Sequence, residues 1–123
     1  MLYRITVETE FLRADLYQRE TVDETLEFLQ AVADTAARID LWRILVSVHA
    51  SRPLFKVDPL FHHFEDLVKA VPFRLALLAD TQELRLAHEY AELVARRHGA
   101  VVRTFRHEAA AAQWLREPAA VVT

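Results

Sequence analysis

The sequence contains no cysteine and a single glycine, Gly99, among its 123 residues. Without cysteine, the chain has no disulfide framework, no thiolate nucleophile and no cysteine-ligated zinc site. With one glycine, it forms neither a P-loop nor the glycine-rich turn of dinucleotide-binding folds. These absences exclude thiol enzymes and the common nucleotide-binding motifs, so the pattern of apolar residues becomes the main guide.

The chain also lacks a surplus of positive charge, because 15 basic residues stand against 18 acidic ones and the net charge is −3. Non-specific binding of nucleic acid needs a surplus of cations, so we expect no nucleic-acid partner. The first ten residues alternate and carry charge, unlike a signal peptide, and the apolar runs are far shorter than the 18 or so residues of a membrane span. We therefore expect a cytoplasmic protein without a membrane span.

Apolar residues make up 53% of the chain, enough for one folded domain of this length. Residues 2–8 and 11–17 alternate between apolar and polar, which predicts a β-hairpin. Apolar runs at 42–48, 73–79 and 100–105 are separated by segments of helical length, which predicts parallel strands joined by right-handed crossovers. If the strands lie in sequential order, crossovers of this kind place their helices on one face of the sheet. We expect the hairpin's twist or a second subunit to cover the other face.

Two helix starts are visible in the sequence. Thr21 and Glu24 have the spacing of a capping box, in which each side chain bonds the other residue's backbone N–H. Asp58 followed by Pro59 predicts an N-cap and a first helical residue for the helix before the strand at 73–79.

The last third of the chain carries a more distinctive pattern. A strand, Phe73-Arg-Leu-Ala-Leu-Leu-Ala-Asp80, precedes a helix containing Leu86-Ala-His-Glu-Tyr-Ala91, and Gly99-Ala-Val-Val-Arg-Thr-Phe105 precedes a short helix with Ala111-Ala-Gln-Trp-Leu115. This pattern resembles the SpoIIAA-like proteins of the STAS/SEC14-type domain family. The resemblance implies one STAS-like α/β domain over residues 1–116, with an N-terminal β-hairpin and a mostly parallel sheet of four to five strands, and a C-terminal tail over residues 117–123.

Relatives with a known role in that family are anti-sigma-factor antagonists, which bind a partner kinase and are switched by serine phosphorylation. The resemblance therefore implies a non-enzymatic regulatory or protein-interaction module. In this chain, the loop that corresponds to the phosphorylated region of those relatives contains Ser51, followed by Arg52 and Pro53. It has no clear phosphoserine motif. The alternative is a small-molecule or lipid-binding protein with an apolar cavity, which the SEC14-type kinship and the seven phenylalanines favour. We find no catalytic motif and expect no cofactor.

In open parallel sheets, ligands bind beyond the carboxyl ends of the strands. Polar side chains that follow the predicted strands are therefore candidate ligand-binding residues, able to hold a small anion. They are His49, Ser51 and Arg52 after the first apolar strand, Asp80 and Thr81 after the second, and Arg106 and His107 after the third.

The pair His62 and His63 is the most plausible start of a metal site, with acidic residues nearby. Adjacent residues on a helix diverge by about 100°, however, so the two imidazoles cannot share one ion comfortably. We interpret them as part of a solvated helix face and expect no metal.

The helix expected after Asp80 has an unusually wide apolar face. Leu86, Tyr90 and Leu93 extend its core stripe to an arc of roughly 200°, whereas covering one sheet face needs little more than 100°. The surplus either packs on a neighbouring helix or forms an exposed patch for a partner. The second reading, with Leu86, Tyr90 and Leu93 as interface residues, predicts a homodimer.

Overall fold

The computed structural model describes residues 1–118, so most of the tail expected at 117–123 lies outside the described residues. The described part is an α/β structure. Its elements, in chain order, are β1 (Leu2–Val7), β2 (Leu12–Tyr17), α1 (Val22–Ile39), β3 (Arg43–His49), α2 (Asp58–His63), α3 (Glu65–Ala70), β4 (Arg74–Ala79), α4 (Gln82–Arg97), β5 (Val102–Thr104) and α5 (Glu108–Arg116).

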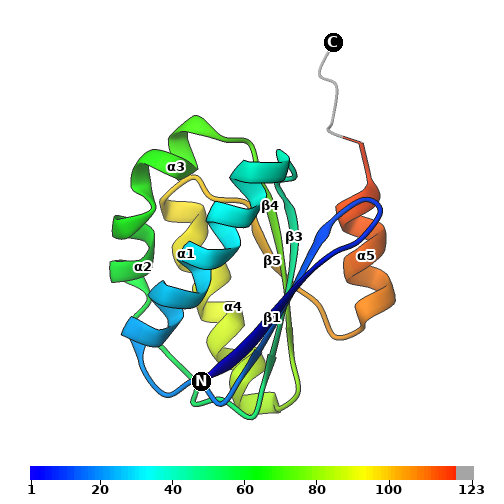
Figure 1. Ribbon diagram of the computed structural model, residues 1–123. Coiled ribbons are helices and arrows are strands. Elements are labelled where there is room, and N and C mark those ends of the chain that lie inside the picture. The colour runs from blue at the N-terminus through cyan, green and yellow to red at the C-terminus, as the bar shows by residue number, and fades with distance from the viewer. Residues whose placement is uncertain (119–123) are drawn as a thin grey trace.

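The five strands form one mixed sheet in sequential order, β1-β2-β3-β4-β5 (Figure 1). β1 and β2 are antiparallel, and every later neighbour pair is parallel. The predicted hairpin and the three predicted parallel strands are therefore confirmed. The sequence favours this arrangement because the central strands are apolar on both faces, as strands covered on both sides must be.

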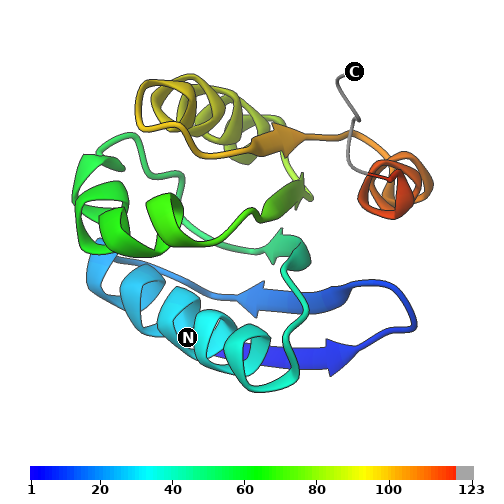
Figure 2. The same ribbon diagram turned by 90° about the horizontal axis from the view of Figure 1, so that it is seen from above.

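Helices α1 to α4 lie on one face of the sheet, and α5 lies on the other (Figures 1 and 2). The first layer contains the larger core, where Phe28 and Val32 of α1 and Leu84 of α4 pack on the apolar side chains of β2, β3 and β4. A sequential strand order with right-handed crossovers forces every β–α–β connection onto this same face.

The second face of the sheet is covered differently from our expectation. Neither the hairpin's twist nor a second subunit is needed over its centre, because α5 folds back across it. The residues of this smaller core are Phe11, Leu45, Ala76, Leu78, Ala111, Ala112 and Leu115. The short alanine-rich helix lies close to the sheet because its contacting side chains are small.

The connection between β3 and β4 also differs from the single capped helix predicted there. It consists of two short helices that meet at Phe64, whose backbone (φ −99°, ψ 16°) departs from helical geometry. Val57 is the N-cap, and the Asp58 carboxylate makes no capping hydrogen bond, so the predicted cap at Asp58 is wrong. Leu60 is the one buried residue of α2, and α3 has none.

The free energy of unfolding should depend on the cap at Thr21 and not on Asp58. The Thr21 hydroxyl accepts from the Glu24 N–H, and the Glu24 carboxylate accepts from the Thr21 N–H, which completes the predicted capping box. We expect Thr21→Ala to lower the free energy of unfolding by about 1 kcal/mol. Asp58→Ala, the matched control, should change it by less than about 0.3 kcal/mol. Urea midpoints measure both, and equal losses would contradict this assignment of the caps.

Candidate functional site

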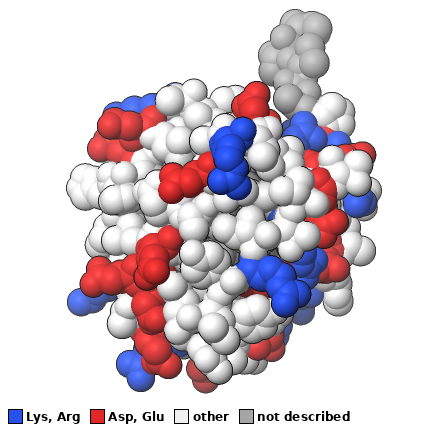
Figure 3. Space-filling model, viewed as in Figure 1, with Lys and Arg blue, Asp and Glu red and all other residues white. Residues whose placement is uncertain are grey.

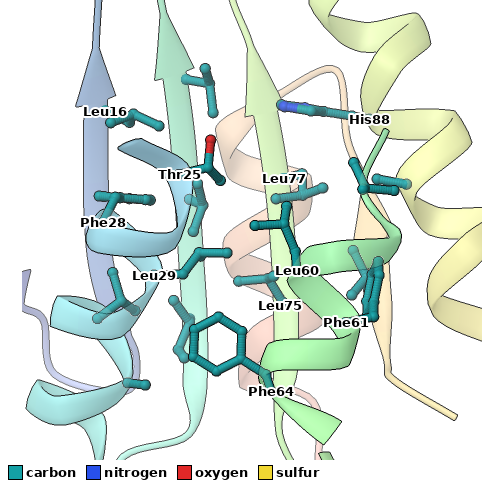
Figure 4. A pocket seen from close by; sticks show the side chains of 18 of the residues that line it. Leu16, Thr25, Phe28, Leu29, Leu60, Phe61, Phe64, Leu75, Leu77 and His88 are labelled. Carbon is teal, nitrogen blue, oxygen red and sulfur yellow. The ribbon is translucent and has the colours of Figure 1, made fainter. Parts of the chain in front are cut away.

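The main concave feature of the described residues is an apolar cavity between the sheet and its first helical layer, with a volume of about 170 Å³. Its walls come from strands β2 to β5 and helices α1 to α4 (Figure 4). Three polar residues, Arg19, Thr25 and His88, also line it. The labelled apolar side chains in Figure 4 are Leu16, Phe28, Leu29, Leu60, Phe61, Phe64, Leu75 and Leu77, and they enclose the space from three sides.

The cavity follows from which residues the sequence places on the facing helices. Val46 of β3 and Leu77 of β4 form part of the floor, and the flanking helices present Ala33 of α1 and Ala87 and Ala91 of α4. An alanine ends at its Cβ atom, so these positions do not fill the space over the central strands. Protein interiors normally close such space, which makes a cavity of this size a notable feature.

The roof of the cavity is the broken helix pair α2–α3. Phe61, Phe64, Leu67 and Val68 line the space, but each of these side chains is only half-buried. A segment with few buried apolar contacts opens at a lower free energy than the core of a domain. The space is thus partly open to solvent, and the half-buried α2–α3 segment borders it.

Arg19 supplies the most unusual group in the cavity wall. The residue is only 5% exposed, and its side chain carries a positive charge at any ordinary pH. One terminal nitrogen donates to the carbonyl of Arg52, whereas the buried Nε has no hydrogen-bond partner among the described residues. In the same part of the chain, no carboxylate lies within ion-pair distance of the guanidinium.

His88 lines the cavity from α4 and reaches across the sheet above Leu77 in Figure 4. It is 8% exposed. Burial, together with the smaller effect of the nearby charge of Arg19, lowers the pKa of His88 to about 4. The imidazole is therefore neutral near pH 7, with one nitrogen that donates and one that accepts.

A smaller polar pocket of about 140 Å³ lies beside the apolar cavity at the carboxyl ends of β4 and β5. Arg85, Glu89, Thr104 and Arg106 line it. Its wall also contains Leu77 and His88, so these two residues separate the polar pocket from the apolar cavity.

Several of the predicted ligand-binding residues use their polar atoms within the fold. The Ser51 hydroxyl accepts from the Arg19 N–H and donates to the His49 carbonyl. The Asp80 carboxylate accepts from the N–H of Ala50, which has a positive φ of 46°. The Thr81 hydroxyl caps α4 by accepting from the Leu84 N–H. These groups hold the loops in place rather than facing the apolar cavity.

His49 lies on the α5 side of the sheet, away from the cavity. Its Nε2 is 2.9 Å from the Ser47 hydroxyl and 3.7 Å from an Asp15 oxygen, and its ring stacks on Tyr17. A nucleophilic triad places the carboxylate and the serine on opposite nitrogens of the imidazole. Here the same nitrogen faces both, so the three residues do not have the arrangement of a triad.

The remaining predicted residues lie apart from one another. Arg52 is exposed and pairs with Glu20 at 3.6 Å, and His107 is the N-cap of α5 without a capping side-chain bond. Arg106 lines the polar pocket. The structure therefore does not bring the seven predicted residues into one site, and none of them lines the apolar cavity. The sequence signals for an apolar cavity were the seven phenylalanines and the resemblance to SEC14-type domains, and neither indicates which residues line it.

The wide apolar face of α4 is exposed rather than packed on a neighbouring helix. Leu86 is 51% exposed and Leu93 is 54% exposed, with Tyr90 between them. Phe55 lies beside Tyr90, with 6.3 Å between the ring centroids. Of the two readings of this face, the structure supports the exposed patch.

The remaining surface and the described helices carry few other functional signals. Figure 3 shows acidic and basic side chains interspersed on one face of the molecule. Within residues 1–118, no helix is long and apolar enough to cross a membrane. In that same range, no three histidine or acidic side chains gather as a metal site.

Comparisons with known proteins give no relative: no family model, no curated protein and no solved structure matches this chain. The resemblance to the SpoIIAA-like proteins therefore stays a prediction, and functional argument rests on the geometry above.

The low pKa of His88 predicts a pH-dependent stability. Between about pH 6.5 and pH 4 the unfolded chain binds a proton at His88 that the folded chain does not, so the free energy of unfolding falls as the pH drops. The loss should amount to roughly 2–3 kcal/mol over this window. His88→Gln should remove that part of the slope, and His62→Gln, at an exposed histidine, should retain it. Urea denaturation at several pH values measures the slope, and identical profiles for all three proteins would refute the assignment.

Proposed function

We propose that this protein binds a small, largely apolar molecule in the cavity between the sheet and α1, α2–α3 and α4. The observation that carries the proposal is the cavity itself, about 170 Å³ with almost wholly apolar walls. An apolar cavity of about 150 Å³ in another protein stays dry and binds benzene. The cavity described here therefore accommodates one ring or a chain of about six carbon atoms.

The expected affinity can be bounded from the apolar contact alone. Burying a methylene group contributes about 0.8 kcal/mol, so a six-carbon body gains about 5 kcal/mol. That corresponds to a dissociation constant on the order of 0.1–1 mM before any polar group contributes. Tighter binding requires a polar group of the ligand to meet one of the polar residues in the wall.

A neutral probe tests the cavity directly. We expect benzene to shift the amide resonances of residues around the cavity in ¹H–¹⁵N spectra and to raise the melting temperature. Ala91→Phe should abolish both effects, because the added ring fills the space beside α4. Ala110→Phe makes the same change at an exposed site of α5 and should retain them. The absence of any shift in the wild-type protein near the solubility limit of benzene would overturn the proposed function.

The regulatory role, the STAS-like assignment and the cytoplasmic location remain predictions of the sequence. For the regulatory role, the structure supplies one relevant fact, since the Ser51 hydroxyl already makes two hydrogen bonds in its loop. A phosphate on this oxygen would break the bond to the His49 carbonyl, because the ester oxygen no longer carries a proton.

We further propose that the protein self-associates through the exposed face of α4. The support is the apolar patch formed by Leu86, Tyr90 and Leu93 together with Phe55. Contiguous exposed apolar surface favours association, and a two-fold dimer is the commonest closed form.

Sedimentation tests this association. The wild-type chain should sediment as a dimer at tens of micromolar, and the double variant Leu86→Glu/Leu93→Glu should sediment as a folded monomer. Leu2→Glu, at a similarly exposed leucine of β1, is the matched control and should leave the dimer intact. A single wild-type species near the chain mass of 14.2 kDa would refute the dimer without affecting the cavity proposal.

A further inference from the structure

We propose that the ligand of the apolar cavity is a monocarboxylate, with its carboxylate held by the Arg19 guanidinium and an apolar body of about six carbons in the cavity. This inference rests on the proposed function and names the class of ligand for the same site. Aryl acids and medium-chain fatty acids have this chemistry.

The first argument is the burial of a cation without a counterion. Arg19 is only 5% exposed, and no carboxylate of the described residues lies within ion-pair distance of it. Glu24 is the carboxylate whose charge acts on Arg19 from a distance. Its oxygens accept from the N–H groups of Glu20 and Thr21 and pair with the terminal amine of Met1. A charge taken out of water is expensive unless it is paired, and the described residues do not supply that pair.

The second argument is that the guanidinium is held in place and keeps a donor free. The backbone of Arg19 is fixed on both sides, because its N–H donates to the Ser51 hydroxyl and its carbonyl accepts from the Arg52 N–H. One terminal nitrogen donates to the Arg52 carbonyl. The buried Nε has no partner among the described residues, but it is shielded from the cavity as well. The other terminal nitrogen makes no hydrogen bond among the described residues and is the donor that a ligand can reach. A guanidinium held in place with such a donor is preorganised for an anionic acceptor.

The third argument concerns the groups that share this end of the cavity. His88 is neutral and offers one N–H, and the Thr25 hydroxyl already donates to the Thr21 carbonyl. The site therefore provides one positive charge and few donors, which suits a monoanion such as a carboxylate better than a dianionic phosphate. Burial lowers the pKa of Arg19, which reflects the same unmet need for a negative partner.

A matched pair of probes separates the head group from the body. Hexanoate and hexanamide have the same chain and nearly the same shape, but only hexanoate is charged. By isothermal titration, the wild-type protein should bind hexanoate at least about tenfold more tightly, the ratio expected for one hydrogen bond to a charged group. In Arg19→Met the two probes should bind within about twofold of each other. Arg38→Met, which removes the same charge from an exposed site on α1, should retain the preference.

A second measurement uses the wild-type protein alone and does not depend on a variant that folds. The terminal guanidinium N–H resonances of Arg19 should move downfield with hexanoate and not with hexanamide, because the bond to a carboxylate deshields the proton.

The outcomes are distinguishable. Equal wild-type affinity for both probes would overturn the carboxylate and leave the cavity proposal standing, whereas failure of benzene, hexanoate and hexanamide alike would overturn the proposed function. Loss of the preference in Arg106→Met rather than in Arg19→Met would place the head group in the polar pocket and also overturn this inference.

Discussion

The sequential order of the parallel strands is the constraint on which the rest of the structure depends. Because each right-handed crossover returns on the same side, α1, α2–α3 and α4 must all share one face of a five-stranded sheet. The long helices α1 and α4 take the flanks of that face, so the space over β3 and β4 is left to the broken pair α2–α3. Leu60 is the one buried residue of that pair, and the cavity lies beneath the pair.

The same constraint assigns α5 its role. A sheet whose crossovers all lie on one side leaves its second face open, and the chain can close it only with an element that follows the last strand. The alanines of α5 and Leu115 meet Leu45 and Ala76 there. Because this packing needs no partner, an interface in this protein is better sought on the exposed face of α4 than on the face of the sheet that α5 covers.

The fold was predictable because its signals are local. Alternation in β1 and β2, the apolar runs of β3 and β4 and the capping box at Thr21 each report on a few neighbouring residues. The cap expected at Asp58 failed although its signal is local, because the helix begins one residue earlier and Val57 is its N-cap. The cover of the second face by α5 was not predicted, because it depends on residues that are distant in the sequence. The site was missed for a related reason. A cavity is a volume that side chains do not fill. Ala33 and Ala91 are far apart in the sequence, and only the fold shows that both line the same space.

The seven predicted site residues illustrate why the rule about strand ends was insufficient. Ser51, Asp80 and Thr81 are where the rule places polar groups, yet each is occupied by a backbone N–H of a neighbouring turn or helix. Buried or half-buried loops must satisfy their own backbone, and short polar side chains are the usual means. The informative group at this edge is Arg19, whose charge and Nε are left unsatisfied by the fold.

An unsatisfied buried cation lowers the stability of the empty protein, since a hydrophobic side chain of similar length would avoid its desolvation. Proteins keep such groups where function requires them and offset their cost elsewhere. Here the cost is concentrated at one end of a cavity that is otherwise apolar, beside His88, which burial keeps neutral. A neutral imidazole adds no second positive charge, so the site retains a single cation and its selectivity is set by Arg19. The apolar walls fix the size of the body that can enter, and the buried guanidinium fixes the charge of its head, so the two features together define one class of ligand.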